Sequence, residues 1–83
     1  MGCIIVYNSS CKPICVFVST YTRSGGDESW FTLAPGARES WRRNKGWELV
    51  AFKDEKDTQR VGVYARVDDL VTFTGDFEDV TIA

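Results

Sequence analysis

Apolar and polar residues alternate with a period of two along most of this chain, and no stretch shows the sustained period of 3.6 that marks a helix. The clearest alternation covers residues 61–67, where small aliphatic side chains are separated by Gly, Tyr and Arg. Residues 14–21 are apolar on both faces over their first half, which predicts a central strand covered on both sides. The whole pattern predicts strands at residues 4–7, 14–21, 30–33, 38–43, 47–53, 61–67, 71–74 and 80–82.

Turn-forming residues separate these segments at regular intervals. Ala34-Pro35-Gly36 predicts a type II turn, because proline sets φ at the second position and glycine accepts a positive φ at the third. Seven or eight short strands with such spacing favour an all-β fold, either a compact antiparallel β-sandwich of the jelly-roll kind or a small barrel. No repeat, linker or low-complexity segment interrupts the pattern, so residues 1–83 are expected to form one domain.

Composition restricts the chemistry that this domain can perform. The chain has 83 residues and no histidine, which excludes histidine-based nucleophile systems and most zinc sites. Its net charge of -2 argues against general affinity for nucleic acid, whose phosphates attract clustered cations. No nucleophile–base pair or phosphate-binding glycine loop is present either. We therefore expect a protein that is not an enzyme, uses no cofactor or metal, and binds no nucleic acid.

The cysteines and the first residues of the chain indicate the cellular compartment in which the protein is expected. Cys3, Cys11 and Cys15 are an odd set, which favours free thiols in a reducing environment. Residues 1–6 contain no basic segment followed by a long apolar run, so we expect a cytoplasmic location and, if the protein is released, a leaderless route. The glycosylation sequon that begins at Asn8 would matter only on a secretory route.

Acidic residues are concentrated near the end of the sequence. Such residues fit either a calcium site, if two acidic turns meet at one end of the fold, or solvated turns that protect sheet edges. The spacing matches no EF-hand loop, and the second interpretation is favoured. The residues are Asp68, Asp69, Asp76, Glu78 and Asp79.

A basic segment surrounds Trp41, with Arg38, Arg42, Arg43 and Lys45 within eight residues. Basic residues interleaved with tryptophan suit anionic lipid headgroups, sulfated or sialylated glycans, or single-stranded nucleic acid. The last of these conflicts with the acidic total charge. The alternative is a structural strand whose arginine stems cover apolar neighbours while the charged ends pair with acidic turns.

The tryptophans are the most informative side chains. Trp30 lies on the strand face opposite to Phe31 and Leu33, so it is exposed if those two are core residues. Trp41 shares its face with charged residues, whereas Trp47 alternates in phase with aliphatic residues and is predicted to be core. An exposed indole can stack on a sugar ring, anchor in a membrane interface or close an oligomer interface. The candidate ligand-binding residues are Trp30, Trp41, Arg42, Arg43, Tyr21, Asp27 and Glu28.

One residue and four segments of the chain carry a resemblance to known proteins: Asn8, Trp30-Phe31-x-Leu33-x-Pro35-Gly36, Trp41-x-Arg43, Trp47-Glu48-Leu49-Val50-x-Phe52-Lys53 and Arg60-Val61-Gly62-Val63-Tyr64. Together they resemble small, leaderless, all-β proteins of mushroom-forming fungi. Some proteins of that kind act as defence lectins, and the aegerolysins, which are longer than this chain, bind membrane lipids. The resemblance implies a binding protein and assigns no functional residue.

These observations lead to one main functional hypothesis and two alternatives. The main hypothesis is a non-enzymatic, lectin-like module that binds a glycan or glycoconjugate and acts as a homo-oligomer, which would raise the avidity of a weak single site. The first alternative is an aegerolysin-like protein that binds membrane lipid through the same residues. The second is a structural or inhibitory module whose exposed aromatic residues contact a protein partner.

Overall fold

The computed structural model describes residues 2–20 and 29–83, and over these residues it contains eight strands and no helix. The prediction of an all-β fold is confirmed, and each of the eight predicted segments overlaps one strand. The strands are β1 (Gly2–Asn8), β2 (Ile14–Val18), β3 (Phe31–Leu33), β4 (Arg38–Arg43), β5 (Trp47–Lys53), β6 (Arg60–Arg66), β7 (Leu70–Phe73) and β8 (Val80–Ile82).

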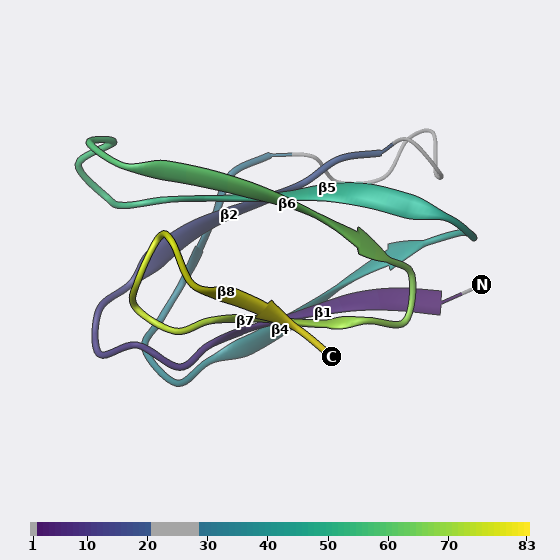
Figure 1. Ribbon diagram of the computed structural model, residues 1–83, viewed down its shortest axis with the longest axis horizontal. Coiled ribbons are helices and arrows are strands. Elements are labelled where there is room, and N and C mark those ends of the chain that lie inside the picture. The colour runs from purple at the N-terminus through teal and green to yellow at the C-terminus, as the bar shows by residue number, and fades with distance from the viewer. Residues whose placement is uncertain (1, 21–28) are drawn as a thin grey trace.

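The strands form two four-stranded sheets that lie one above the other as two layers (Figure 1). The β1 sheet has the strand order β4-β1-β7-β8, and the β5 sheet has the order β3-β2-β5-β6. Among the described strands, β1 and β7 pair in parallel, and the other pairings are antiparallel. Consecutive strands β4 and β5 belong to different sheets, so the turn between them carries the chain from one layer to the other.

The core lies between the two sheets and takes alternate residues from each strand. Phe52 of the β5 sheet stacks on Phe73 of the β1 sheet, with 5.3 Å between ring centroids. On β6, Ala65 is buried while Tyr64 and Arg66 are exposed, which confirms the alternation predicted for residues 61–67. The buried apolar residues are Ile4, Val6, Ile14, Val16, Val18, Leu33, Trp41, Val50, Phe52, Ala65, Val71 and Phe73.

Strand β2 is central within its sheet, as predicted, but only its inner face is fully covered. Val16 and Val18 are buried against the other layer, whereas Cys15 and Phe17 on the outer face are only half-buried. The prediction of cover on both sides was therefore wrong, because no helix or third sheet among the described residues packs on this side. Trp30 partly covers Phe17, and their ring centroids are 5.6 Å apart.

Two polar features fix the chain at one end of the sheets. The Ala37 amide donates a hydrogen bond to the Ala34 carbonyl over 3.0 Å, and Gly36 has a φ of 75°, which confirms the predicted type II turn. Asn8 is fully buried, and its side-chain amide donates to the carbonyls of Lys12 (2.8 Å) and Leu33 (3.0 Å). In this fold the sequon asparagine is therefore an internal hydrogen-bonding residue.

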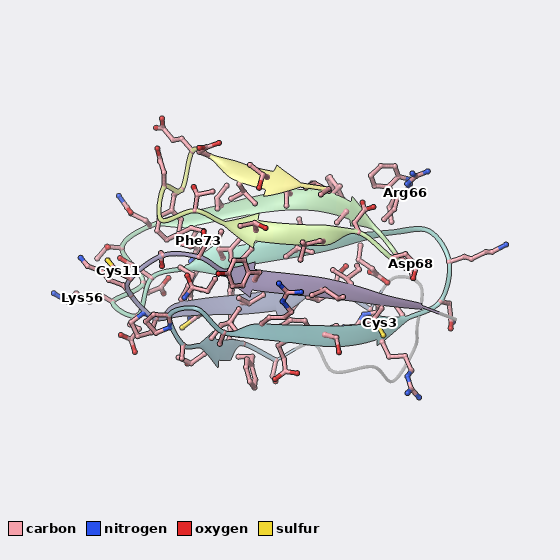
Figure 2. The ribbon with its side chains drawn as sticks, turned by 90° about the horizontal axis from the view of Figure 1, so that it is seen from below. Cys3, Cys11, Lys56, Arg66, Asp68 and Phe73 are labelled. Carbon is pink, nitrogen blue, oxygen red and sulfur yellow. The ribbon has the colours of Figure 1, made fainter. Side chains whose placement is uncertain are left out.

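All three cysteines are free thiols, and Figure 2 shows Cys3 and Cys11 at opposite ends of the molecule. The Sγ of Cys15 lies 3.9 Å from the hydroxyl oxygen of Thr32 on the neighbouring strand. None of the described residues forms a helix long and apolar enough to cross a membrane.

Candidate functional site

Two of the predicted ligand-binding residues, Trp41 and Arg43, lie inside the molecule. Trp41 is 5% exposed and Arg43 is 1% exposed, so neither can contact a ligand as predicted. Both occupy inward positions of β4, and the ring of Trp41 meets the edge of Phe31 with 6.0 Å between centroids. Phe31 is itself 41% exposed at the margin of the core, whereas Leu33 is buried. The predicted core assignment of this strand is therefore correct for Leu33 and wrong for Phe31.

Arg43 belongs to a buried polar cluster, which we define as Arg43, Glu48 and Ser19. The Arg43 guanidinium donates to the carbonyls of Ser19 (2.7 Å from Nε) and Val18 (3.0 Å from Nη2). Its Nε lies 4.0 Å from the Glu48 carboxylate, which accepts a 2.5 Å hydrogen bond from the Ser19 hydroxyl. This cluster connects β4 of one sheet to β5 and the end of β2 in the other through hydrogen bonds and a charge pair.

Arg42 and Trp30, the other two predicted site residues that the structure describes, lie on opposite sides of the molecule. Arg42 is exposed on the outer side of the β1 sheet, where it aligns with Cys3. Trp30 is 38% exposed, as predicted, but it contacts the β5 sheet on the opposite side of the molecule. The remaining candidates, Tyr21, Asp27 and Glu28, lie outside the described residues.

Trp47, which was predicted to be core, is 56% exposed on the outer side of β5. The prediction was wrong because Glu48 points inward and joins the buried polar cluster. Val50 and Phe52 lie on the same face of β5 as Glu48, so they are buried in the core. The sequence contained one part of the signal for the correct phase, the clear alternation of residues 61–67, and the structure supplied the other part, the strand register. The antiparallel pairing of β5 with β6 aligns Trp47 with Arg66, so the clear alternation of β6 determines which face of β5 is exposed.

The outer side of the β5 sheet brings together side chains that are far apart in the sequence. We call this surface the aromatic face, and it presents Trp30 (38% exposed), Trp47 (56%) and Tyr64 (62%). Basic side chains lie among these rings. The outward residues that define the face are Cys15, Phe17, Trp30, Thr32, Trp47, Leu49, Ala51, Lys53, Arg60, Gly62, Tyr64 and Arg66.

One end of the aromatic face is centred on Trp30. The Lys53 ammonium lies 4.6 Å from the centroid of the indole ring, and the Arg60 guanidinium lies 5.8 Å from it. The cations are positioned by pairing of Lys53 with Arg60 across β5 and β6, while Phe17 packs on the indole from β2. This end therefore combines a large apolar ring with two positive charges.

The other end of the face is centred on Trp47. The Arg66 guanidinium lies 5.7 Å from the centroid of this indole, and Arg66 is labelled at one end of the molecule in Figure 2. Between the two ends lie the small paired residues Ala51 and Gly62 and the pair of Leu49 with the exposed Tyr64. Lys53 follows Trp47 by six positions along extended β5, a span of about 20 Å.

The charge on the aromatic face differs in sign from that of the whole chain. None of the outward-facing residues described on β2, β3, β5 and β6 is acidic, although the chain has 12 acidic residues and a net charge of -2. Within residues 2–20 and 29–83, Lys53 and Arg66 make no ion pair. The face is therefore a basic, aromatic surface on an acidic protein.

Among the described residues, Asp57, in the turn between β5 and β6, is the acidic residue that forms an ion pair with a cation of this face. Its carboxylate accepts hydrogen bonds from Nε (2.7 Å) and Nη2 (2.8 Å) of Arg60. These hydrogen bonds lower the pKa of Asp57 and raise the pKa of Arg60. Asp57 has a φ of 59°, in the left-handed region that asparagine also tolerates.

Acidic residues near the end of the sequence accept hydrogen bonds from backbone amides within their own turns. A carboxylate oxygen of Asp69 accepts from the backbone amide of Arg66 over 2.8 Å, and one of Asp76 accepts from the amide of Glu78 over 2.9 Å. Among the residues that the structure describes, no three His, Cys, Asp or Glu side chains converge as a metal site requires. These contacts agree with the interpretation of solvated turns.

Comparison with protein-family models, curated proteins and solved structures finds no match for this chain. The aromatic face is therefore identified from its own geometry, as the surface where exposed rings and unpaired cations coincide. It retains Trp30 from the residues that the sequence predicted and adds Trp47, Tyr64, Lys53 and Arg66.

Proposed function

We propose that this protein is a non-enzymatic, lectin-like module that binds a glycan on the aromatic face. The observation that carries the proposal is the exposure of Trp30, Trp47 and Tyr64 on one side of one sheet. An exposed aromatic ring can stack on the apolar side of a pyranose, while neighbouring polar groups bind its hydroxyls. The two facing sheets would then form a β-sandwich that holds these rings in fixed positions.

Two of these rings, Trp47 and Tyr64, have no role in the core. The core contains its own aromatic contacts, including the stack of Phe52 on Phe73, and does not need Trp47 or Tyr64. Large exposed apolar patches are uncommon on soluble proteins unless they bind something. Rings held on paired strands also lose little freedom on binding, because their positions are already set by the sheet.

The aromatic face is open and shallow, so one copy would bind a glycan weakly. We propose that the protein acts as a homo-oligomer, in which several faces engage one multivalent glycan. Strand β6 lies at the edge of the β5 sheet and offers backbone groups for pairing between copies. Sedimentation of the purified chain tests this part of the proposal, and a monomer at all concentrations would contradict it.

A glycan array probed with the full chain tests the proposed function. Trp47→Ala and Trp30→Ala are each expected to reduce the signal for every bound glycan. The matched control is Tyr7→Ala on the outer side of the β1 sheet, where the Arg38 guanidinium lies 5.3 Å from the ring centroid. The proposal would be overturned by an array without signal, or by equal losses in Trp47→Ala and Tyr7→Ala.

Binding to membrane lipid is the second candidate function. It is favoured by the cation beside each exposed indole, because tryptophan and basic residues both occur at membrane interfaces. Co-sedimentation with vesicles of phosphatidylcholine alone and with added phosphatidylserine tests it. Unchanged tryptophan fluorescence with both kinds of vesicle would exclude it.

A protein-interaction module would instead give a tight oligomer and no response in either the glycan or the lipid assay.

A further inference from the structure

The two ends of the aromatic face repeat one arrangement of chemical groups. Each has an exposed indole with a basic side chain over the ring, at 4.6 Å for Lys53 on Trp30 and 5.7 Å for Arg66 on Trp47. A ligand unit that suits such a pair has an apolar plane and an anionic substituent. A sugar ring that carries a carboxylate or sulfate has both.

We propose that the aromatic face binds an acidic oligosaccharide that lies along the strands and contacts both ends at once. This inference rests on the proposed glycan-binding function and specifies its ligand class. The ends are about 20 Å apart along β5, which is longer than a single sugar ring. Between them, the outward residues are the small Ala51 and Gly62 and the pair Leu49 and Tyr64, so the middle of the chain would lie against aliphatic side chains and the exposed Tyr64 ring.

The contacts of the cations support an anionic ligand. An exposed cation–π contact is weak, so a sugar ring can displace Lys53 or Arg66 from its indole at little cost. The displaced charge remains close to the stacked sugar and can pair with its acidic group. Neither cation has an ion pair within the described part of the chain, so no salt bridge has to be broken, although the Lys53 charge also helps to lower the pKa of Asp57.

Asp57 acts as an internal competitor for the same ligand. It forms two hydrogen bonds to Arg60, which lies 5.8 Å from the centre of the Trp30 ring. A carboxylate or sulfate on a bound sugar would have to share Arg60 with Asp57. Removing the Asp57 charge should therefore strengthen binding, a gain that loss of structure cannot imitate.

The test is titration of the full chain with defined oligosaccharides, monitored by tryptophan fluorescence and calorimetry. The probes are an oligogalacturonide, which carries carboxylates, a heparin-derived oligosaccharide of similar length, which also carries sulfates, and a neutral cello-oligosaccharide. We expect at least one acidic probe to bind more tightly than the neutral probe, and to bind more weakly as salt increases. The preferred acidic probe identifies the anionic group. A disaccharide of it should bind about tenfold more weakly than the longer chain.

Variants of the two faces provide the matched comparison. Lys53→Ala with Arg66→Ala should weaken binding of the acidic probe about tenfold, as expected for two exposed charge-assisted contacts. Arg38→Ala with Arg42→Ala removes the same charge from the opposite side of the molecule and should change binding less than about twofold. Asp57→Asn, in a backbone conformation that asparagine tolerates, should strengthen binding about two- to threefold.

Each contrary result has a distinct meaning. Equal binding of neutral and acidic probes would overturn the acidic ligand and leave the proposed glycan-binding function standing. Equal binding of the disaccharide and the longer chain would overturn contact with both ends. No binding of any oligosaccharide would overturn both proposals, and tighter binding of a single-stranded oligothymidylate would show that the face recognises phosphate chains instead.

Discussion

The buried polar cluster and the aromatic face contain the same kinds of residue and use them in opposite ways. In the cluster, Arg43 lies near Glu48 between the sheets, with Trp41 on the same strand also buried. On the aromatic face, Arg66 lies over Trp47 in contact with solvent. A basic residue near a tryptophan in the sequence therefore does not by itself indicate a binding site.

The difference follows from the cost of removing charge from water. A buried guanidinium must have its hydrogen bonds satisfied by the protein, and Arg43 donates to the carbonyls of Ser19 and Val18. An exposed guanidinium keeps its hydration and can exchange it for a ligand. The charged groups of the cluster are therefore occupied by contacts inside the protein, while those of the aromatic face remain in water, where they can contact a ligand.

The largest expected effect is on stability and comes from breaking the cluster. Glu48→Ala leaves the Arg43 charge buried beside an incomplete set of partners and should cost about 3–5 kcal/mol of unfolding free energy. That is a large part of the stability of a small domain. Urea denaturation measures it, with Glu39→Ala on exposed β4 as the control. Loss of less than about 1 kcal/mol would show that the cluster is not a stabilising contact.

Replacing both charges sharpens the same comparison. Arg43→Met with Glu48→Leu fills similar volume without leaving a lone charge, and should recover most of the stability lost in Glu48→Ala. If the double variant is as unstable as the single one, the hydrogen bonds of Arg43 to the β2 backbone matter more than the charge pair.

The two tryptophans give the next largest difference. Trp41→Ala removes a buried ring that contacts Phe31 and should destabilise the fold by about 3 kcal/mol. Trp47→Ala removes a mainly exposed ring and should change stability by less than about 1 kcal/mol while reducing glycan binding. Thermal unfolding and the glycan titration measure the two properties separately. Equal destabilisation by both changes would contradict the distinction between the two regions.

The smallest effect concerns acid stability at the turn beside the aromatic face. Hydrogen bonds from Thr58 lower the pKa of Asp54, and those from Arg60 lower the pKa of Asp57. The stability they add is complete above the unfolded aspartate value of about 3.9 and is lost as pH falls through the lower folded values. Denaturation between pH 5 and 2 should show this loss, and Asp54→Asn with Asp57→Asn should reduce it. An unchanged acid profile in that variant would assign the loss to other carboxylates.

The pattern of apolar, polar and turn-forming residues predicted the strands well, because a strand and its flanking turns depend on residues that are neighbours in the sequence. The alternation of residues 61–67, the type II turn at Pro35-Gly36 and the strand at residues 38–43 all reflect short-range geometry. The candidate site was harder to predict because it required knowing which face of each strand meets the other sheet. For β5, both faces carry apolar residues, so composition alone could not decide between Trp47 and Glu48.

The sequence by itself determined that this is an all-β chain of seven or eight short strands, without histidine and with more aromatic residues than its core uses. Only the tertiary structure decided which aromatic and basic residues reach solvent. It did so by placing β4 and β5 in different sheets and by bringing Arg43 within 4.0 Å of Glu48. The physical reason is that two charges near each other can be buried together, and this pairing reversed the expected orientation of β5 and put Trp47 on the surface.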